Sequence, residues 1–179
     1  MGCVGTSFDQ ISDEQADLIR NSPLFFVASA APELSQGADG VGPVNLSPKG
    51  GVPLHIVDAN RVAYLDYTGS GNQTANHATA GGPITLMVMS MGEEDAAIVR
   101  LFGHATVTPV DESPLRDLLL EVPADNIELP MRQVIDVAIE STQTSCGYGV
   151  PVFEFVKQRE RPERGRRFKP GSPAPAAQR

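Results

Sequence analysis

The sequence has few cysteines and no long apolar run, and each absence excludes a class of protein. Its two cysteines, Cys3 and Cys146, are too few for a disulfide framework, and neither belongs to a Cys-x-x-Cys or paired Cys/His spacing of a structural zinc site. No apolar stretch approaches the roughly 18 residues that span a bilayer, and none has the pattern of a signal peptide. We therefore expect a soluble, cytoplasmic protein without a structural metal.

Positive charge is also scarce outside the end of the chain. Of the 14 lysines and arginines, eight lie in residues 157–179, and the preceding residues hold six cations against twenty carboxylates. An acidic body of this kind argues against nucleic acid as a partner. A phosphate bound to it would find few side chains to neutralise it. The six cations are Arg20, Lys49, Arg61, Arg100, Arg116 and Arg132.

The length of 179 residues, with 41% hydrophobic residues, suits one domain with a core and two flanking segments. We expect an N-terminal segment with a short helix over 1–23, a folded domain over 24–157 and a basic, disordered, Pro/Gly-rich tail over 158–179. In the first segment, Ser12 and Gln15 have the spacing of a capping box at the start of a helix.

Most of the middle of the chain has the composition of β-strands. Strands are predicted at 24–30, 61–67, 84–91, 97–107 and 133–141, of which 84–91 is apolar enough to be buried on both faces. A short strand from Val44 is expected to end in a turn at Ser47-Pro48-Lys49-Gly50. Helices are expected only at connections. Successive hairpin-like strands favour a mainly β fold with short α-helices, arranged as an antiparallel, Greek-key-like barrel.

The most informative local arrangement is a strand, a Gly-rich turn and a helix start over residues 64–77. Two glycines open the turn, and the N–H groups at the helix start could cradle an anion, with side-chain donors at Ser70, Asn72, Gln73 and Thr74. The alternative is structural: Ser70 or Asn72 caps the helix, and the glycines only turn the chain.

A phosphate bound at this turn would also need a cation. Lys49, which we expect in a turn of its own, Arg100 or Arg132 could supply it. The alternative for Lys49 is an ordinary solvated lysine.

A second polar arrangement, S-T-Q-T-S-C-G-Y-G-V-P over residues 141–151, directly follows a predicted strand. We expect it to form one turn whose hydroxyls, amide, thiol and phenol can hydrogen-bond the polar edge of a planar ring. Cys146 has no recognisable pairing with a histidine, so a small, partly buried thiol is favoured over a nucleophile. The three histidines lack metal-ligand spacing and predict no metal site.

Several of these segments resemble the pyridoxamine 5′-phosphate oxidase-like family, in a subgroup whose function is undefined. They are F-F-V-A-S-A, V-N-L-S-P-K-G, V-A-Y-L-D-Y-T-G-S-G-N-Q-T-A-N-H, R-L-F-G-H-A and, most specifically, Q-T-S-C-G-Y-G-V-P, in order over about residues 24–156. The resemblance implies a split β-barrel homodimer with non-covalent FMN at the subunit interface. The implied cofactor-binding residues are Lys49, Ser70, Asn72, Gln73 and Thr74 toward the phosphate, and Gln143, Ser145 and Cys146 nearer the ring. Ser47 and Arg100 are further cofactor-binding candidates.

The resemblance implies a flavin-dependent oxidoreductase acting on a small molecule, in which the cofactor carries the chemistry and no catalytic residue can be named. The alternatives are the deazaflavin F420 in place of FMN, or a protein that binds or senses flavin or haem without turnover. The oxidases of this family have more Arg and Lys in the segment that matches G-S-G-N-Q-T, and C-terminal Arg and His motifs that have no obvious equivalent here. Pyridoxamine-phosphate oxidation is therefore not expected.

The first residues, M-G-C-V-G-T, have the pattern of an N-myristoylation site, and Cys3 could then be palmitoylated. Membrane contact is expected only if such a lipid is attached, in which case the basic tail could assist it electrostatically.

Overall fold

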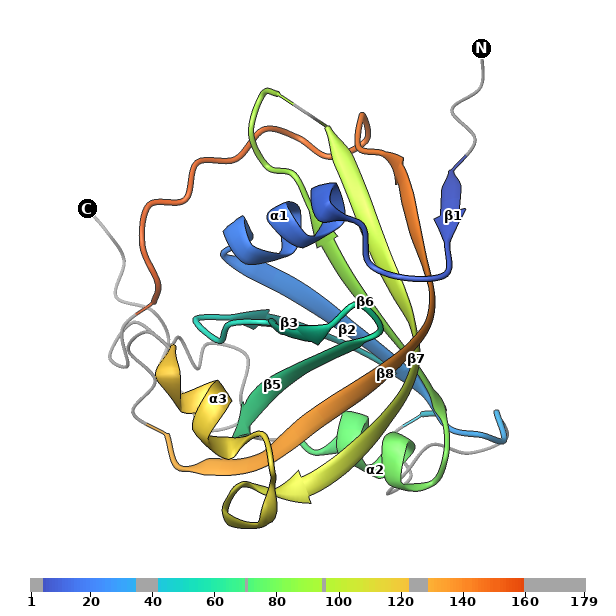
Figure 1. Cartoon of the computed structure of the whole chain (residues 1–179), viewed down its shortest axis with the longest axis vertical. Coiled ribbons are helices and arrows are strands. Elements are labelled where there is room, and N and C mark those ends of the chain that lie inside the picture. Colours follow the sequence, from blue (N-terminus) through green and yellow to red (C-terminus); the bar gives the residue numbers. More distant parts are fainter. Residues whose placement is uncertain (1–4, 35–41, 70, 95, 123–128, 160–179) are drawn as a thin grey trace, which may run out of the picture.

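The computed structural model describes residues 5–34, 42–69, 71–94, 96–122 and 129–159 (Figure 1). The expected lipidation site at Gly2 and Cys3, the candidate Ser70 and the tail beyond Arg159 lie outside these residues. The strands are β1 (Thr6–Phe8), β2 (Leu24–Ala30), β3 (Val44–Gly50), β4 (His55–Asp58), β5 (Arg61–Tyr67), β6 (Pro83–Met89), β7 (Ala97–Pro109) and β8 (Met131–Cys146). The helices are α1 (Asp13–Asn21), α2 (Gln73–Thr79) and α3 (Arg116–Glu121), with a 3-10 turn, η2 (Val110–Glu112).

The strands form one antiparallel sheet in the order β3–β2–β6–β7–β8–β5–β4, and β1 pairs with β8. The sheet curls into a barrel whose two edge strands are β3 and β4 (Figure 1). The fold is therefore the mainly β, antiparallel split barrel that the sequence predicts. Among the described residues, no helix is long and apolar enough to cross a membrane.

The first helix begins as predicted, with a complete capping box. The N–H of Gln15 donates to Ser12 Oγ (3.3 Å), and the N–H of Ser12 donates to Gln15 Oε1 (3.1 Å). Gln15 is itself buried, and its side chain donates to Thr144 Oγ1 (3.0 Å) and accepts from Thr142 Oγ1 (2.9 Å). These bonds attach α1 to the inward face of β8.

The main core fills the barrel, and a smaller one lies outside it. Alternate residues of the strands, such as Val27, Leu86 and Leu101, point inward and are buried. Outside the barrel, α3 packs through Leu119 on Leu65 of β5 and its neighbours. Consequently β5, rather than the predicted segment 84–91, is buried on both faces. In β6 only one face is fully buried, since its buried residues alternate with less buried ones.

The prediction of a turn at Ser47-Pro48-Lys49-Gly50 is wrong, because β3 continues to Gly50. Pro48 is tolerated in a strand because β3 is a sheet edge, where the N–H that proline lacks is not needed for pairing. The turn follows at Gly51, whose φ of 74° suits glycine.

The turn predicted over residues 141–151 is also wrong in its first half, because β8 continues to Cys146. Residues 141–146 pair with residues 97–102 of β7, which is long enough to extend the ladder. The two inward-facing threonines of this segment are satisfied by Gln15, so a polar strand end can be buried there. The chain turns only at Gly147, whose N–H donates to the carbonyl of Ala96 (2.8 Å).

Candidate functional site

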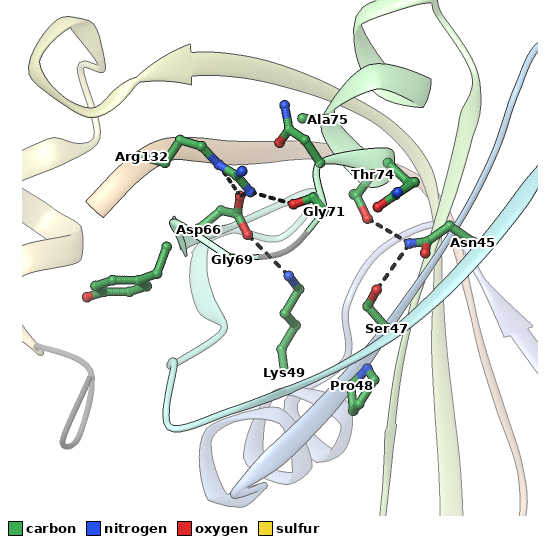
Figure 2. Close-up of a pocket in the computed structure, with 13 residues that line it drawn as sticks. Asn45, Ser47, Pro48, Lys49, Asp66, Gly69, Gly71, Thr74, Ala75 and Arg132 are labelled. Atoms are coloured by element: carbon green, nitrogen blue, oxygen red, sulfur yellow. Dashed lines mark hydrogen bonds and ion pairs between the residues drawn. The ribbon is translucent and has the colours of Figure 1, made fainter. Parts of the chain in front are cut away.

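An open cavity of about 300 Å³ lies where the edge strand β3, the end of β5, the start of α2 and the start of β8 meet (Figure 2). Five of the cofactor-binding residues expected from the sequence line it together: Ser47, Lys49, Asn72, Gln73 and Thr74. The other described lining residues are Asn45, Pro48, Asp66, Tyr67, Gly69, Gly71, Ala75 and Arg132.

Asp66 is the centre of the polar contacts in this cavity. Its carboxylate accepts from Lys49 Nζ (3.1 Å) and from Arg132 Nη2 (2.6 Å) and Nε (3.2 Å), as Figure 2 shows. A further donor, Gln133 Nε2, lies 2.9 Å away. Burial raises the pKa of the Asp66 carboxyl, but the hydrogen bond from Arg132 and the charge of Lys49 outweigh it, and the pKa lies below its ordinary value. Asp66 is therefore an ionised, buried carboxylate.

The same side chains hold the glycine-rich turn against β8. Arg132 Nη2 donates to the carbonyl of Gly71 (3.1 Å), and Gln133 Nε2 donates to Asn72 Oδ1 (2.8 Å). Asn72 occupies the N-cap position of α2, but its side chain makes no capping hydrogen bond. The alternative that Asn72 caps the helix through its side chain is thus wrong, because its amide contacts Gln133 instead.

Asn45 joins the other side of the cavity. Its Nδ2 donates to Ser47 Oγ (3.1 Å) and to Thr74 Oγ1 (3.1 Å), and so ties β3 to the first turn of α2. Asn45, Ser47 and Lys49 share one face of β3 because they alternate along a strand. Sequence reasoning missed Asn45 because it placed Ser47 and Lys49 in a turn, and so did not put the three side chains on one face.

Asp66 was missed for another reason. It is the one carboxylate in the predicted strand at 61–67, a signal that a buried charge with partners elsewhere was present. Its partners come from strands that the sequence does not place beside it.

A second cavity, of about 520 Å³, adjoins the first and shares Pro48, Lys49, Asp66 and Tyr67 with it. Its other walls are more apolar, with Val52, Leu65 and Leu129, and the C-terminal segment adds Lys157, Gln158 and Arg159. The two spaces together offer a polar end and a less polar end on either side of Lys49.

The remaining candidates lie elsewhere in the chain. Arg100 Nη1 donates to Ser145 Oγ (2.9 Å), and Arg100 pairs across the sheet with Gln143. Cys146 is the last residue of β8, and its Sγ accepts from the N–H of Tyr148 (3.5 Å). These residues are at the end of β8 opposite to Arg132, so one chain does not bring the two groups together.

Arg100 stands on an outward face of the sheet that is largely apolar. Cross-strand pairing places Pro48, Phe26, Met87, Arg100 and Gln143 in one row over five strands. The next row along the same face contains Leu46, Ala28, Thr85, Phe102 and Ser141. Leu46 is 66% exposed, and within the described residues Arg100 has no ion pair.

No protein-family model matches the sequence. The chain is 31% identical over 152 residues to ustO, a pyridoxamine 5′-phosphate oxidase family protein of Aspergillus flavus, and the match covers 83% of this chain. The chain belongs to the pyridoxamine 5′-phosphate oxidase family. It spans 57% of the length of ustO.

Solved structures share the fold of this family member. One is a candidate pyridoxamine 5′-phosphate oxidase from Lactobacillus delbrueckii, with 23% identity, a TM-score of 0.53 and coverage of 79% of this chain and 98% of that one. Another is an FMN-binding protein from Syntrophomonas wolfei, with 11% identity, a TM-score of 0.51 and coverage of 79% and 84%.

The described side chains at the cavity are suited to binding a ligand. The cavity offers two cations, hydroxyls and amides, which suit an anionic, hydrogen-bonding group. Among the described residues, no group of three or more His, Cys, Asp or Glu could hold a metal ion. Neither His77 nor His104 lines the cavity. His77 is buried and hydrogen-bonded to Ser29 Oγ (3.0 Å), and His104 contacts Glu140 (3.0 Å).

Proposed function

We propose that this protein is an FMN-binding flavoprotein that works as a homodimer. The observation that carries the proposal is the cavity at Lys49, which gathers five of the expected cofactor-binding residues from the edge strand β3 and the start of α2. Hydroxyl and amide donors from Ser47, Asn72 and Thr74 surround it, and Lys49 and Arg132 supply positive charge. These donors can hydrogen-bond the oxygens of a phosphate group.

The outward sheet face supports a role for a second copy. Its two apolar rows begin at the edge strand with Leu46 and Pro48, and Pro48 also lines the cavity. A second chain packed on this face would cover the apolar residues. It would also bring a partner's Arg100, Gln143 and Ser145 toward the cavity, where they could contact the flavin ring.

We further propose a flavin-dependent oxidoreductase with a small-molecule substrate. When bound, FMN supplies hydride transfer at its N5 atom. The residues of this chain hold its phosphate, orient the ring and limit the access of water. The second, more apolar cavity beside Lys49 and Tyr67 has room for part of the ring or the substrate.

Titration with FMN tests the binding proposal. The wild-type protein is expected to quench FMN fluorescence on binding, and Lys49→Gln should weaken that affinity about tenfold by removing a charge-assisted hydrogen bond. The matched control is Arg20→Gln, because Arg20 is an exposed cation on α1 paired only with Asp17 among the described residues. Binding that is equal in both variants, or absent in the wild type, would contradict the proposal.

The purified protein then distinguishes the kinds of cofactor. Flavin bands support FMN, whereas a Soret band would indicate haem and overturn the flavin proposal. Bleaching of the flavin by reduced nicotinamide supports an oxidoreductase, and flavin that no donor reduces would leave a binding protein.

A further inference from the structure

We propose that Asp66 sets the charge of the anion that the cavity accepts. By neutralising one of the two cations there, it makes the site better suited to a singly charged group than to a doubly charged phosphate. This inference rests on the proposed function in taking the cavity as the phosphate site.

Both cations of the cavity are directed at one carboxylate. Lys49 comes from β3 and Arg132 from β8, and each lies within hydrogen-bonding distance of Asp66 on β5 (Figure 2). Neither cation is therefore free of a counter-ion when an anion arrives. A ligand must share Lys49 and Arg132 with a charge of its own sign.

Asp66 is held in place and cannot easily withdraw. Its side chain is 9% exposed, and the neutral donor Gln133 Nε2 occupies a further acceptor position. Gln133 is in turn bonded to Asn72, so the carboxylate is fixed from the side of β8 as well as from β3. Displacing it would leave a buried carboxylate without its partners, which is costly.

The charge of the described lining then sums to one positive unit. Two cations and one carboxylate are present, and the other described lining residues are uncharged at neutral pH. A phosphate monoester carries about 1.5 to 2 negative charges at pH 7, so it would leave the site with a net negative charge. A singly charged group would leave it neutral.

The decisive change is Asp66→Asn, which keeps the shape of the side chain and removes its charge. The probe is inorganic phosphate, and the readout is the rise in melting temperature with phosphate concentration at constant ionic strength, made up with chloride. The half-saturating phosphate concentration is expected to fall about tenfold in Asp66→Asn relative to wild type. The control is Asp136→Asn, since Asp136 also pairs with an arginine, Arg61, but lies outside the cavity.

A second variant keeps the test decisive if Asp66→Asn does not fold. Gln73→Lys adds a cation to the lining and leaves the four hydrogen bonds of Asp66 in place, so it should produce the same gain. No gain in phosphate affinity in the folded variants, or an equal gain in Asp136→Asn, would overturn the inference.

Flavins separate this inference from the proposed function. The affinity ratio of FMN to riboflavin is expected to rise about tenfold in Asp66→Asn, because only FMN carries the phosphate. If no variant binds either flavin while Asp66→Asn still gains phosphate affinity, the FMN proposal fails and the role of Asp66 stands. A flavin ratio that stays at the wild-type value in Asp66→Asn would overturn the role of Asp66 even though FMN binds.

Discussion

Lys49 Nζ lies 3.1 Å from Asp66 Oδ1, and this ion pair joins two strands that are not neighbours in the sheet. Lys49 stands on the edge strand β3, whereas Asp66 stands on β5, next to the opposite edge. The pair therefore bridges the split of the barrel at the point where the candidate site opens. Asp66 therefore both ties β5 to β3 and lines the candidate site.

Asp66→Asn should reduce the free energy of unfolding and make it less dependent on pH in the acid range. Without phosphate, we expect the free energy of unfolding to fall by about 3 kcal/mol, because two partly buried cations lose their counter-ion. The pKa of Asp66 is lowered in the folded protein, so its contribution is complete above the unfolded value of about 3.9 and is lost as pH falls through the lower folded value. Urea denaturation from pH 7 downward measures both effects.

Asp136→Asn is again the comparison, because its partner Arg61 is more exposed than Lys49 or Arg132. The free energy of unfolding is expected to fall less in Asp136→Asn than in Asp66→Asn. Equal losses of stability in the two variants would show that the ion pairs of Asp66 contribute no more than the more exposed pair of Asp136 and Arg61.

Leu46→Glu should disrupt the proposed dimer. Leu46 is 66% exposed on the apolar outward face, so the monomer should tolerate a charge that a packed interface would not. Sedimentation velocity is expected to show a monomer, and titration with FMN is expected to show a weaker affinity. Val122→Glu, at an exposed apolar residue after α3, should leave both properties unchanged. A wild-type protein that is already monomeric would refute the dimer.

Gly103→Ala should destabilise the barrel strongly. A Cβ at this position would lie 1.9 Å from the carbonyl oxygen of Ala138, at the irregularity where β7 and β8 change register. The backbone carbonyl cannot move away without disturbing the strand pairing. We therefore expect the free energy of unfolding, measured by chemical denaturation, to fall by about 3 kcal/mol. Gly92→Ala is the matched control, because its Cβ would meet nothing within 4 Å. A variant as stable as the control would contradict this account of the bulge.

Gln15→Ala should loosen α1 from the barrel. The substitution removes the hydrogen bonds to Thr142 and Thr144 and the capping bond to Ser12, and Thr142 is fully buried. We expect a loss of about 2 kcal/mol in urea denaturation, because buried polar atoms lose partners. The exposed Asp17→Asn on the same helix should change stability little, and a similar loss in both variants would argue against a specific role for Gln15.

The sequence by itself determined the class of the fold, the position of most strands and the capping box at Ser12. These features depend on local signals, namely alternation of apolar residues and the spacing of a cap, which act over a few residues. The polar turn at 69–74 was recognisable for the same reason. Five candidate residues on β3 and this turn do line one cavity.

Only the tertiary structure decided where strands ended and which charges met. β3 continues through Pro48 because it is a sheet edge, and β8 continues to Cys146 because β7 and Gln15 satisfy it. The meeting of Lys49, Asp66 and Arg132 depends on which strands lie side by side. Interactions between residues distant in sequence follow from the path of the whole chain, which no local pattern specifies.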